Sequence, residues 1–286
     1  MRVKAVVSSV GLDSAENDDR AGWIETPAGL YAWVIDGATN VAGRDYLGTG
    51  QGDVPWYAQA LSDALAARAP EGLAPRALHE AAARDASSAY DKLVKRLAGP
   101  PPLHAQPMAA LVLVRLSGGV ADLYELGDCP AFALRGDAVH RLTAAVRRPD
   151  AVEATAGIAA RQAEIGHDAK AIWRDRLPAL QRERDVQLSR SPLRVSTPAP
   201  GAVFGGRESS LELAGAAAIV LMSDGYERFA ADYGLGDDAA MIRRTVAEGP
   251  ERLLAEIRAL EADDPNCRRI PRLKPSDDAT CLVLAP

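Results

Sequence analysis

The stretch LYAWVIDG, residues 30–37, is an apolar run that ends on an acidic residue followed by a glycine. Its bulky and β-branched side chains predict a buried strand, with Asp36 at the rim of the core and a sharp turn at Gly37. Residues 218–225, AIVLMSDG, repeat the pattern and present Asp224 in the same way. Two buried strands are therefore each expected to deliver one carboxylate at their end.

Two pairs of acidic residues accompany other expected strand ends. Asp18 and Asp19 lie in a polar turn, and Asp277 and Asp278 directly precede the last expected strand, 279–284. Each site alone has an ordinary explanation, because Asp and Gly are common in turns. If all four converged without a cation, like-charge repulsion would raise the carboxylate pKa values and lower stability. Oxygen ligands of this kind favour Mg²⁺ or Mn²⁺, so the sequence indicates a metal site.

Composition and charge exclude several classes of function. The chain has 286 residues, of which 48% are hydrophobic and 25% charged, as in ordinary globular proteins. Its formal net charge is −6 and it has no basic run, so nucleic acid is not expected as the principal partner. No apolar stretch is long enough to span a membrane or to form a signal sequence. Three cysteines without a CxxC pair favour reduced thiols and a cytoplasmic location: Cys129, Cys267 and Cys281.

The order of the expected elements predicts an α+β fold, in which helices pack on sheets without regular βαβ alternation. The segment 145–200 is charged and rich in Ala and Arg, which favours a solvated helical insertion. The expected elements are strands 4–10, 22–26 and 30–36, helices 55–68 and 75–97, strands 108–116, 120–126, 131–134 and 139–142, strands 211–213 and 216–222, helices 237–246 and 250–263, and strand 279–284.

Five short motifs, taken in order, resemble those of the metal-dependent protein phosphatases, type 2C. They are Asn17-Asp18-Asp19, Val34-Ile35-Asp36-Gly37, Gly127-Asp128-Cys129-Pro130-Ala131-Phe132, Met222-Ser223-Asp224-Gly225 and Asp277-Asp278-Ala279-Thr280. The resemblance spans nearly the whole chain and is that of a divergent, bacterial-like member. It implies a single catalytic domain, 1–286, built as a four-layer α/β/β/α sandwich of two mainly antiparallel sheets flanked by helix pairs, with a helical insertion or flap at about 145–200.

The resemblance also implies a set of site residues. Asp36 would bridge two Mn²⁺ or Mg²⁺ ions with help from the Gly37 carbonyl. Asp19 would reach one of these ions, and Asp224 and Asp277 would hold the other, with Asp18 and Asp278 as the alternatives within their pairs. Asp128 would help to bind a third, looser ion. A hydroxide between the metals would attack phosphoserine or phosphothreonine in line, without a phosphoenzyme. The implied partner is a phosphorylated protein in signal transduction, and we expect a monomer.

The sequence departs from the family pattern in two places. Ser14 stands where many members carry a phosphate-binding arginine. Arg20 and Arg44 are the candidates to replace it, although ordinary surface roles would also explain both. Ala38 follows the central Asp-Gly where other members have His or Met, so a histidine general acid is absent. The four histidines of the chain show no metal-ligand spacing, and surface or capping roles are favoured for all of them.

Three functions remain open at this stage. The leading hypothesis is a phosphoserine/phosphothreonine protein phosphatase. The second is a non-catalytic relative that binds phosphoproteins, which Ser14 favours. The third is a two-metal phosphoesterase for small molecules. Retention of all the core acids argues against the second, because a binding module has little use for converging carboxylates.

Overall fold

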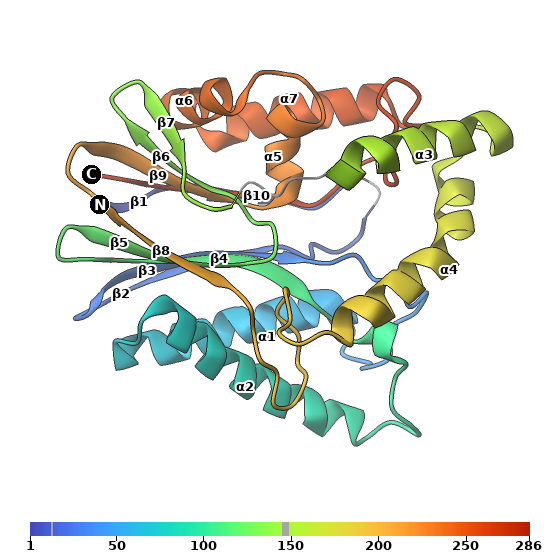
Figure 1. Ribbon diagram of the computed structural model, residues 1–286, viewed down its shortest axis with the longest axis horizontal. Helices are drawn as coiled ribbons and strands as arrows, with labels where there is room; N and C mark the ends of the chain where they lie inside the picture. The colour runs from blue at the N-terminus through green and yellow to red at the C-terminus, as the bar shows by residue number, and fades with distance from the viewer. Residues whose placement is uncertain (13, 145–148) are drawn as a thin grey trace.

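Two antiparallel sheets pack face to face, and helices cover their outer surfaces (Figure 1). The structure is a computed structural model that describes residues 1–12, 14–144 and 149–286, so the first four residues of the predicted insertion, 145–148, lie outside the described residues. Within these ranges, ten strands form two five-stranded sheets. The predicted α+β class, with two antiparallel sheets between outer helices, is confirmed.

Each sheet combines strands that are far apart in the sequence. The sheet named here the β9 sheet has the order β1 (Arg2–Ser9), β10 (Ala279–Ala285), β9 (Ala216–Met222), β6 (Ala131–Arg135) and β7 (Ala138–Arg141). The sheet named here the β3 sheet has the order β2 (Arg20–Thr26), β3 (Gly29–Gly37), β4 (Ala109–Ser117), β5 (Val120–Leu126) and β8 (Arg207–Glu212).

Helices form the two outer layers. The β3 sheet is covered by α1 (Asp53–Arg68) and α2 (Pro75–Val94), with the short 3₁₀ turns η1 (Ala69–Glu71) and η2 (Leu103–Ala105) after them. The β9 sheet is covered by α5 (Asp224–Ala231), α6 (Asp238–Glu248) and α7 (Pro250–Asp263). The predicted helix 75–97 ends early because the N–H groups of Arg96 and Leu97 bond to carbonyls three residues back, which tightens the last turn.

The alternation of side chains along β3 determines where its acid points. Tyr31, Trp33 and Ile35 pack against α1 and α2, whereas Ala32 and Val34 face the β9 sheet. Successive residues of a strand point to opposite faces, so Asp36 shares the face of Val34 and lies between the sheets. On β9, Ile219 and Leu221 occupy the same inter-sheet layer. The apolar layer between the sheets therefore ends at the acidic residues.

The two Asp-Gly motifs have a different physical basis from the one expected. Neither Gly37 nor Gly225 has a positive φ, so the expected sharp turn is not the reason for glycine there. A Cβ at Gly225 would lie 1.9 Å from the Asp278 carbonyl oxygen, and one at Gly37 would lie 2.6 Å from the Asp18 carbonyl oxygen. Both glycines are required because another backbone segment passes against them.

His79 also differs from the expectation. Surface or capping roles were favoured for the histidines, but His79 on α2 is fully buried, and that prediction is wrong for this residue. Its Nε2 lies 2.9 Å from the hydroxyl of Ser196, which also bonds to the hydroxyl of Tyr57 at 2.8 Å. Burial lowers the pKa of His79 to about 3, so the ring is neutral. This cluster ties α1 and α2 to the last part of the insertion.

The insertion contains two helices, α3 (Pro149–Ile165) and α4 (Ala169–Leu188), at the end of the sandwich opposite the chain termini (Figure 1). Ile172 of α4 is buried, and Gln181 donates a hydrogen bond of 2.8 Å to the Val41 carbonyl. Arg161 of α3 forms ion pairs with Asp175 of α4. The insertion is thus attached to the loop that follows β3.

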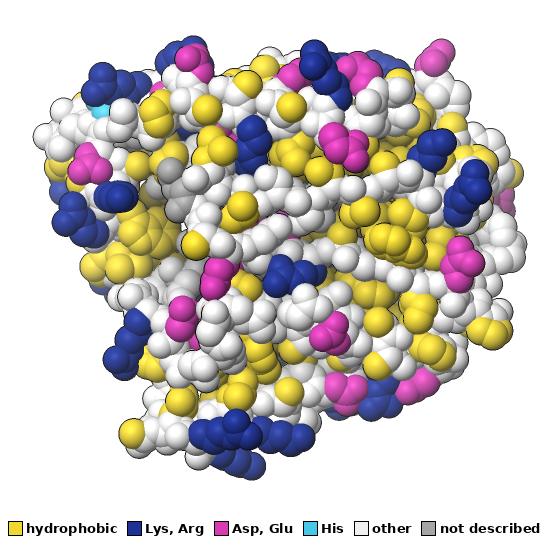
Figure 2. All heavy atoms as spheres, turned by 180° about the vertical axis from the view of Figure 1, so that it is seen from behind, with side chains coloured by type: hydrophobic (Ala, Val, Ile, Leu, Met, Phe, Trp, Pro, Cys, Tyr) yellow, Lys and Arg dark blue, Asp and Glu magenta, His cyan; other side chains and the backbone are white. Residues whose placement is uncertain are grey.

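The surface is of mixed charge. Figure 2 shows basic and acidic side chains interspersed over the face seen from behind. In the described part of the chain, no helix combines the length and apolar character needed to cross a membrane.

The close approach at Gly225 yields a test of the fold. Gly225→Ala should lower the free energy of unfolding by about 1–3 kcal/mol, because the added Cβ must displace the Asp278 backbone. Gly157→Ala in α3 is the matched control, since a Cβ there meets no atom within 4 Å and Ala favours helix over Gly. Chemical denaturation of both variants measures the difference. Equal stability of the two variants would show that the contact at Gly225 is not close.

Candidate metal centre

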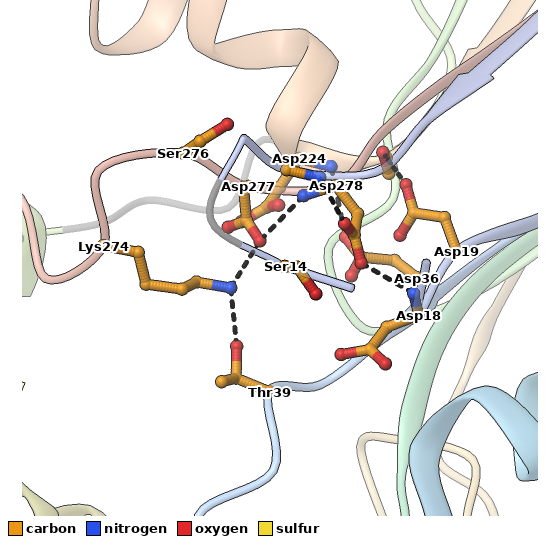
Figure 3. Close-up of polar contacts among 12 residues, drawn as sticks. Ser14, Asp18, Asp19, Asp36, Thr39, Asp224, Lys274, Ser276, Asp277 and Asp278 are labelled. Atoms are coloured by element: carbon orange, nitrogen blue, oxygen red, sulfur yellow. Dashed lines mark hydrogen bonds and ion pairs between the residues drawn. The ribbon is translucent and has the colours of Figure 1, made fainter. Parts of the chain in front are cut away.

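Asp36 and Asp19 lie near each other where β3 and β9 end and β2 begins (Figure 3). One oxygen of Asp36 accepts a hydrogen bond of 3.2 Å from the backbone N–H of Asp224, the first residue of α5. Asp19 is almost fully buried and accepts a hydrogen bond of 2.7 Å from the hydroxyl of Ser223. That hydroxyl also accepts the N–H of Thr280 at 2.9 Å, so β10 is joined to the same point.

These carboxylates strongly favour their protonated forms in the absence of a cation. Burial, followed by repulsion from Asp224 and Asp19, raises the pKa of Asp36 well above its usual range. Burial also raises the pKa of Asp19 well above its usual range, although the Ser223 hydroxyl opposes the change. Like charges in a poorly solvated space disfavour ionisation of each other. A divalent cation would remove this penalty.

Asp18 and Asp278 play different parts within the acidic cluster. The two oxygens of Asp278 accept backbone hydrogen bonds from Gly11 at 2.8 Å and from Asp18 at 2.6 Å. Asp278 therefore holds the loop before β2 against the start of β10. Burial and then repulsion from Asp278 raise the pKa of Asp18 to about 7.

Asp277 has two cationic hydrogen-bond partners. Its carboxylate accepts a hydrogen bond from the ammonium of Lys274 (Figure 3). It accepts another from the guanidinium of Arg228. Burial opposes ionisation, but Lys274 and Arg228 outweigh it and hold the pKa of Asp277 below its usual value. Arg228 lies one helical turn after Asp224 on α5. The chain itself thus neutralises one side of the cluster.

Asp128 and Cys129 lie at the break between β5 and β6. Asp128 lines a cavity of about 340 Å³ together with Asp36, Asp224 and Asp277. Cys129 is buried, and burial followed by the nearby Asp36 raises the pKa of its thiol well above the usual range. Cys129 is therefore a protonated, packed residue.

Cationic and aromatic side chains complete the walls of this cavity. Lys274, Arg228 and Arg184 line it, as does Trp173 of α4. Arg184 donates a hydrogen bond of 3.2 Å to the Thr39 carbonyl, and burial lowers its pKa to about 10. An adjoining cavity of about 890 Å³ contains Ser14, Asp18, Lys274 and Asp277 among its lining residues. Phosphate-sized anions would meet positive charge on one side of the space and carboxylates on the other.

The two arginines suggested by the sequence lie elsewhere. Arg20 donates to the side chain of Gln59 at 2.7 Å and to the Asn17 and Asp19 carbonyls at 2.6 and 2.7 Å. The guanidinium of Arg44 stacks on the ring of Tyr46, 4.4 Å from its centre. Neither belongs to the described residues that line the two cavities. Arg20 instead supports the backbone that carries Asp19.

The acidic cluster suits a hard divalent cation at Asp36 and Asp19 but not at Asp277. Asp36 and Asp19 offer carboxylate oxygens whose raised pKa values reflect a missing positive charge. Asp277 differs, because both of its oxygens already accept hydrogen bonds from cations. Over the described residues, no three His, Cys, Asp or Glu side chains are arranged as a ready-made metal site. Ligation of an ion would therefore require small side-chain movements around Asp36.

Comparison with known proteins identifies the family. A family model described as protein phosphatase 2C matches residues 12–258, which is most of the chain. The chain belongs to the protein phosphatase 2C family. The matched residues contain the first four of the five motifs, and the fifth, 277–280, follows the end of the match. A search of curated protein sequences finds no match.

Solved structures of bacterial enzymes share the protein phosphatase 2C fold. The serine/threonine phosphatase PstP/Ppp of Mycobacterium tuberculosis is 17% identical, with a TM-score of 0.58 and coverage of 99% of this chain and 98% of that one. The serine/threonine phosphatase Stp1 of Staphylococcus aureus is 12% identical, with a TM-score of 0.59 and coverage of 100% and 97%. The catalytic domain of PstP in complex with two manganese ions is 19% identical, with a TM-score of 0.54 and coverage of 98% and 96%.

Three cations of this protein phosphatase 2C chain were missed by the sequence analysis: Lys274, Arg228 and Arg184. Two of them carry a local signal, since Lys274 precedes Asp277 by three residues and Arg228 follows Asp224 by four, the spacings at which side chains of a helical turn meet. Arg184 carries no such signal, because it reaches the cavity only through the placement of α4.

The raised carboxylate pKa values predict how the stability of this protein phosphatase 2C chain depends on pH. Between about pH 4 and pH 7, the folded metal-free chain keeps the proton on Asp18 that the unfolded chain releases. Its free energy of unfolding should therefore fall as pH rises, by up to about 1.4 kcal/mol per pH unit for this carboxyl. Asp277, with its lowered pKa, stabilises the fold throughout this range and does not change the sign.

Denaturation with urea in EDTA at pH 5, 6, 7 and 8 measures this dependence. Asp18→Asn, which cannot ionise, should make the dependence shallower. Added Mn²⁺ should raise stability more at pH 8 than at pH 5, because it offsets the repulsion among ionised carboxylates. Stability that rises with pH in EDTA would contradict the raised pKa of Asp18.

Proposed function

We propose that the chain is a phosphoprotein phosphatase that hydrolyses phosphoserine and phosphothreonine with a divalent metal ion, Mn²⁺ or Mg²⁺. The proposal treats residues 1–286 as a single catalytic domain with α3 and α4 as the wall of its substrate site. Membership of the protein phosphatase 2C family supports the class of reaction. The two manganese ions described for PstP support a divalent metal for this chain.

One observation carries the proposal. Asp36 and Asp19 are held together between the ends of the two sheets with raised pKa values, beside a cavity that also contains basic side chains. Ionisation of these acids requires a cation, and the basic side chains suit the anionic phosphoryl group. Phosphoryl transfer depends chiefly on positioning and on neutralising charge, which are the two properties that this arrangement offers.

Each residue has a definite part in the proposed reaction. A bound Mn²⁺ or Mg²⁺ would supply Lewis acidity toward the phosphoryl oxygens and lower the pKa of water. Asp36, Asp19 and the Gly37 carbonyl would hold it, with Asp224 and Asp128 as further ligands. The Ser223 hydroxyl and the Asp224 N–H orient Asp19 and Asp36 through the hydrogen bonds described above. Arg184 and Lys274 would bind and orient the substrate phosphate.

Attack by a protein side chain is not part of the proposal. The thiol of Cys129 stays protonated because burial raises its pKa. Among the described residues that line the two cavities, there is no histidine to act as general acid. Direct transfer to water therefore fits these residues better than a covalent intermediate.

A second candidate is supported by one specific observation. Because Lys274 and Arg228 already neutralise Asp277, the chain could bind a phosphorylated segment in this cavity without hydrolysing it. This function is a phosphoprotein-binding module with the same fold. Hydrolysis of small phosphate esters is the third hypothesis, which the substrates chosen below separate from the first.

Hydrolysis of para-nitrophenyl phosphate and of a phosphothreonine peptide, in Mn²⁺ or in EDTA, tests the proposal. The native chain should turn over both in Mn²⁺, and Asp36→Asn should lower kcat/KM by about 10²-fold or more, because a central carboxylate is lost. Asp63→Asn on the exposed face of α1 makes the same chemical change away from the cavity and should leave kcat/KM unchanged.

The results distinguish the three hypotheses. Turnover of the ester far above that of the peptide would favour a small-molecule phosphoesterase. A folded native chain that binds Mn²⁺ and phosphopeptide without turnover would favour the binding module.

A further inference from the structure

Lys274 lies at the junction of the two sheets in the acidic cluster. Its ammonium donates a hydrogen bond of 2.7 Å to the Thr39 hydroxyl and another to Asp277 (Figure 3). Thr39 follows β3 and Asp277 precedes β10, so the lysine joins the ends of both sheets. Its side chain is only 29% exposed, although lysines usually lie in solvent. The ammonium is therefore a fixed charge in the centre.

The acidic cluster has two electrically different sides. The four charged groups that most affect Asp36 are all carboxylates: Asp224, Asp19, Asp128 and Asp277. On the other side, one oxygen of Asp277 accepts from Lys274 and from its neighbour's N–H, and the other oxygen accepts from Arg228. These bonds use three of the four lone pairs of Asp277, so a metal ion would have to compete with both cations for this carboxylate. The Asp277 side of the cluster is therefore a poor site for a divalent ion, because Lys274 and Arg228 already supply positive charge there.

We propose that the ammonium of Lys274 takes the place of one of the two metal ions implied by the family resemblance. The chain would bind a single divalent ion at Asp36 and Asp19, and Lys274 would provide the second positive charge that holds the substrate phosphate. This inference rests on the proposed function and deepens it.

The geometry of Lys274 suits an anionic ligand. An ammonium has three N–H donors, and the recorded interactions of Lys274 use two of them, with Thr39 and Asp277. Lys274 lines both the 340 Å³ cavity and the 890 Å³ cavity, so its remaining donor is within reach of a ligand in this space. Because Asp277 and Thr39 fix the ammonium, a phosphate would meet a preorganised charge.

The number of Mn²⁺ ions bound per chain tests the proposal without reference to turnover. Equilibrium dialysis followed by metal analysis should find one tightly bound Mn²⁺ in the native chain. Lys274→Met removes the charge and frees Asp277, so a second Mn²⁺ should bind at the same free concentration. Lys274→Arg keeps the charge and should retain one ion. Lys170→Met removes an exposed lysine that lines the larger cavity without a recorded contact to Asp277, and it should also retain one ion.

Phosphate affinity provides the second measurement. With one equivalent of Mn²⁺ per chain, inorganic phosphate should bind to Lys274→Met about tenfold more weakly than to the native chain, as expected for loss of one charge-assisted hydrogen bond. Lys170→Met should bind phosphate like the native chain. Isothermal titration gives these affinities. If Lys274→Met does not fold, Lys274→Gln, which keeps a polar end without the charge, replaces it with the same expected results.

Two results would overturn the inference. One is two tightly bound Mn²⁺ ions in the native chain, and the other is unchanged metal stoichiometry and phosphate affinity in the folded Lys274→Met or Lys274→Gln variant. Failure of the proposed function has a different signature, because a native chain without turnover can still show one Mn²⁺ and lysine-dependent phosphate binding. A native chain that turns over substrate with two ions would keep the function and reject the role of Lys274.

Discussion

Repulsion among carboxylates held in one poorly solvated space is the constraint on which the rest of this structure depends. The strand register that buries Val34 also places Asp36 between the sheets, and Asp19 lies beside it under the Ser223 hydroxyl. Free carboxylates would move apart into water. Here the apolar layers on both faces of each sheet fix the strand ends and prevent that movement. The fold thus holds the carboxylates in an arrangement whose electrostatic repulsion is relieved only by added positive charge.

Local patterns in the sequence predicted most of the strands and helices. Alternation along residues 30–37 and 218–225 predicted two buried strands. The first, β3, pairs with its neighbours along the chain, β2 and β4, whereas β9 pairs with β6 and β10, which are distant in sequence. Strand periodicity also fixes the face on which Asp36 lies, because side chains alternate with a period of two. The reason for glycine after each acid was not predictable. Close backbone contact at Gly225 involves Asp278, which lies 53 positions later and meets it only in the folded chain.

Contacts between distant segments account for what the sequence did not predict. Lys274 and Thr39 are 235 positions apart, and Arg184 and Thr39 are 145 positions apart, so no window of sequence contains either pair. The burial of His79 likewise depends on Ser196, which is 117 positions away. Arg20 and Arg44 were chosen for their nearness along the chain to the acidic motifs. The cations that lie near the acids in the fold are instead Arg184 of α4, Arg228 of α5 and Lys274 of the loop before β10.

Thr39 forms two hydrogen bonds that together connect α4 to the acidic cluster. Its backbone carbonyl accepts a hydrogen bond from Arg184 of α4, and its hydroxyl accepts one from Lys274. Thr39 is therefore hydrogen-bonded both to the insertion and to the Lys274 ammonium. A displacement of α4 would therefore change the position of Thr39 and with it the hydrogen bond to Lys274. The placement of the insertion and the charge balance around Asp277 are thereby coupled through one threonine, which is 145 positions from Arg184 and 235 from Lys274 in the sequence.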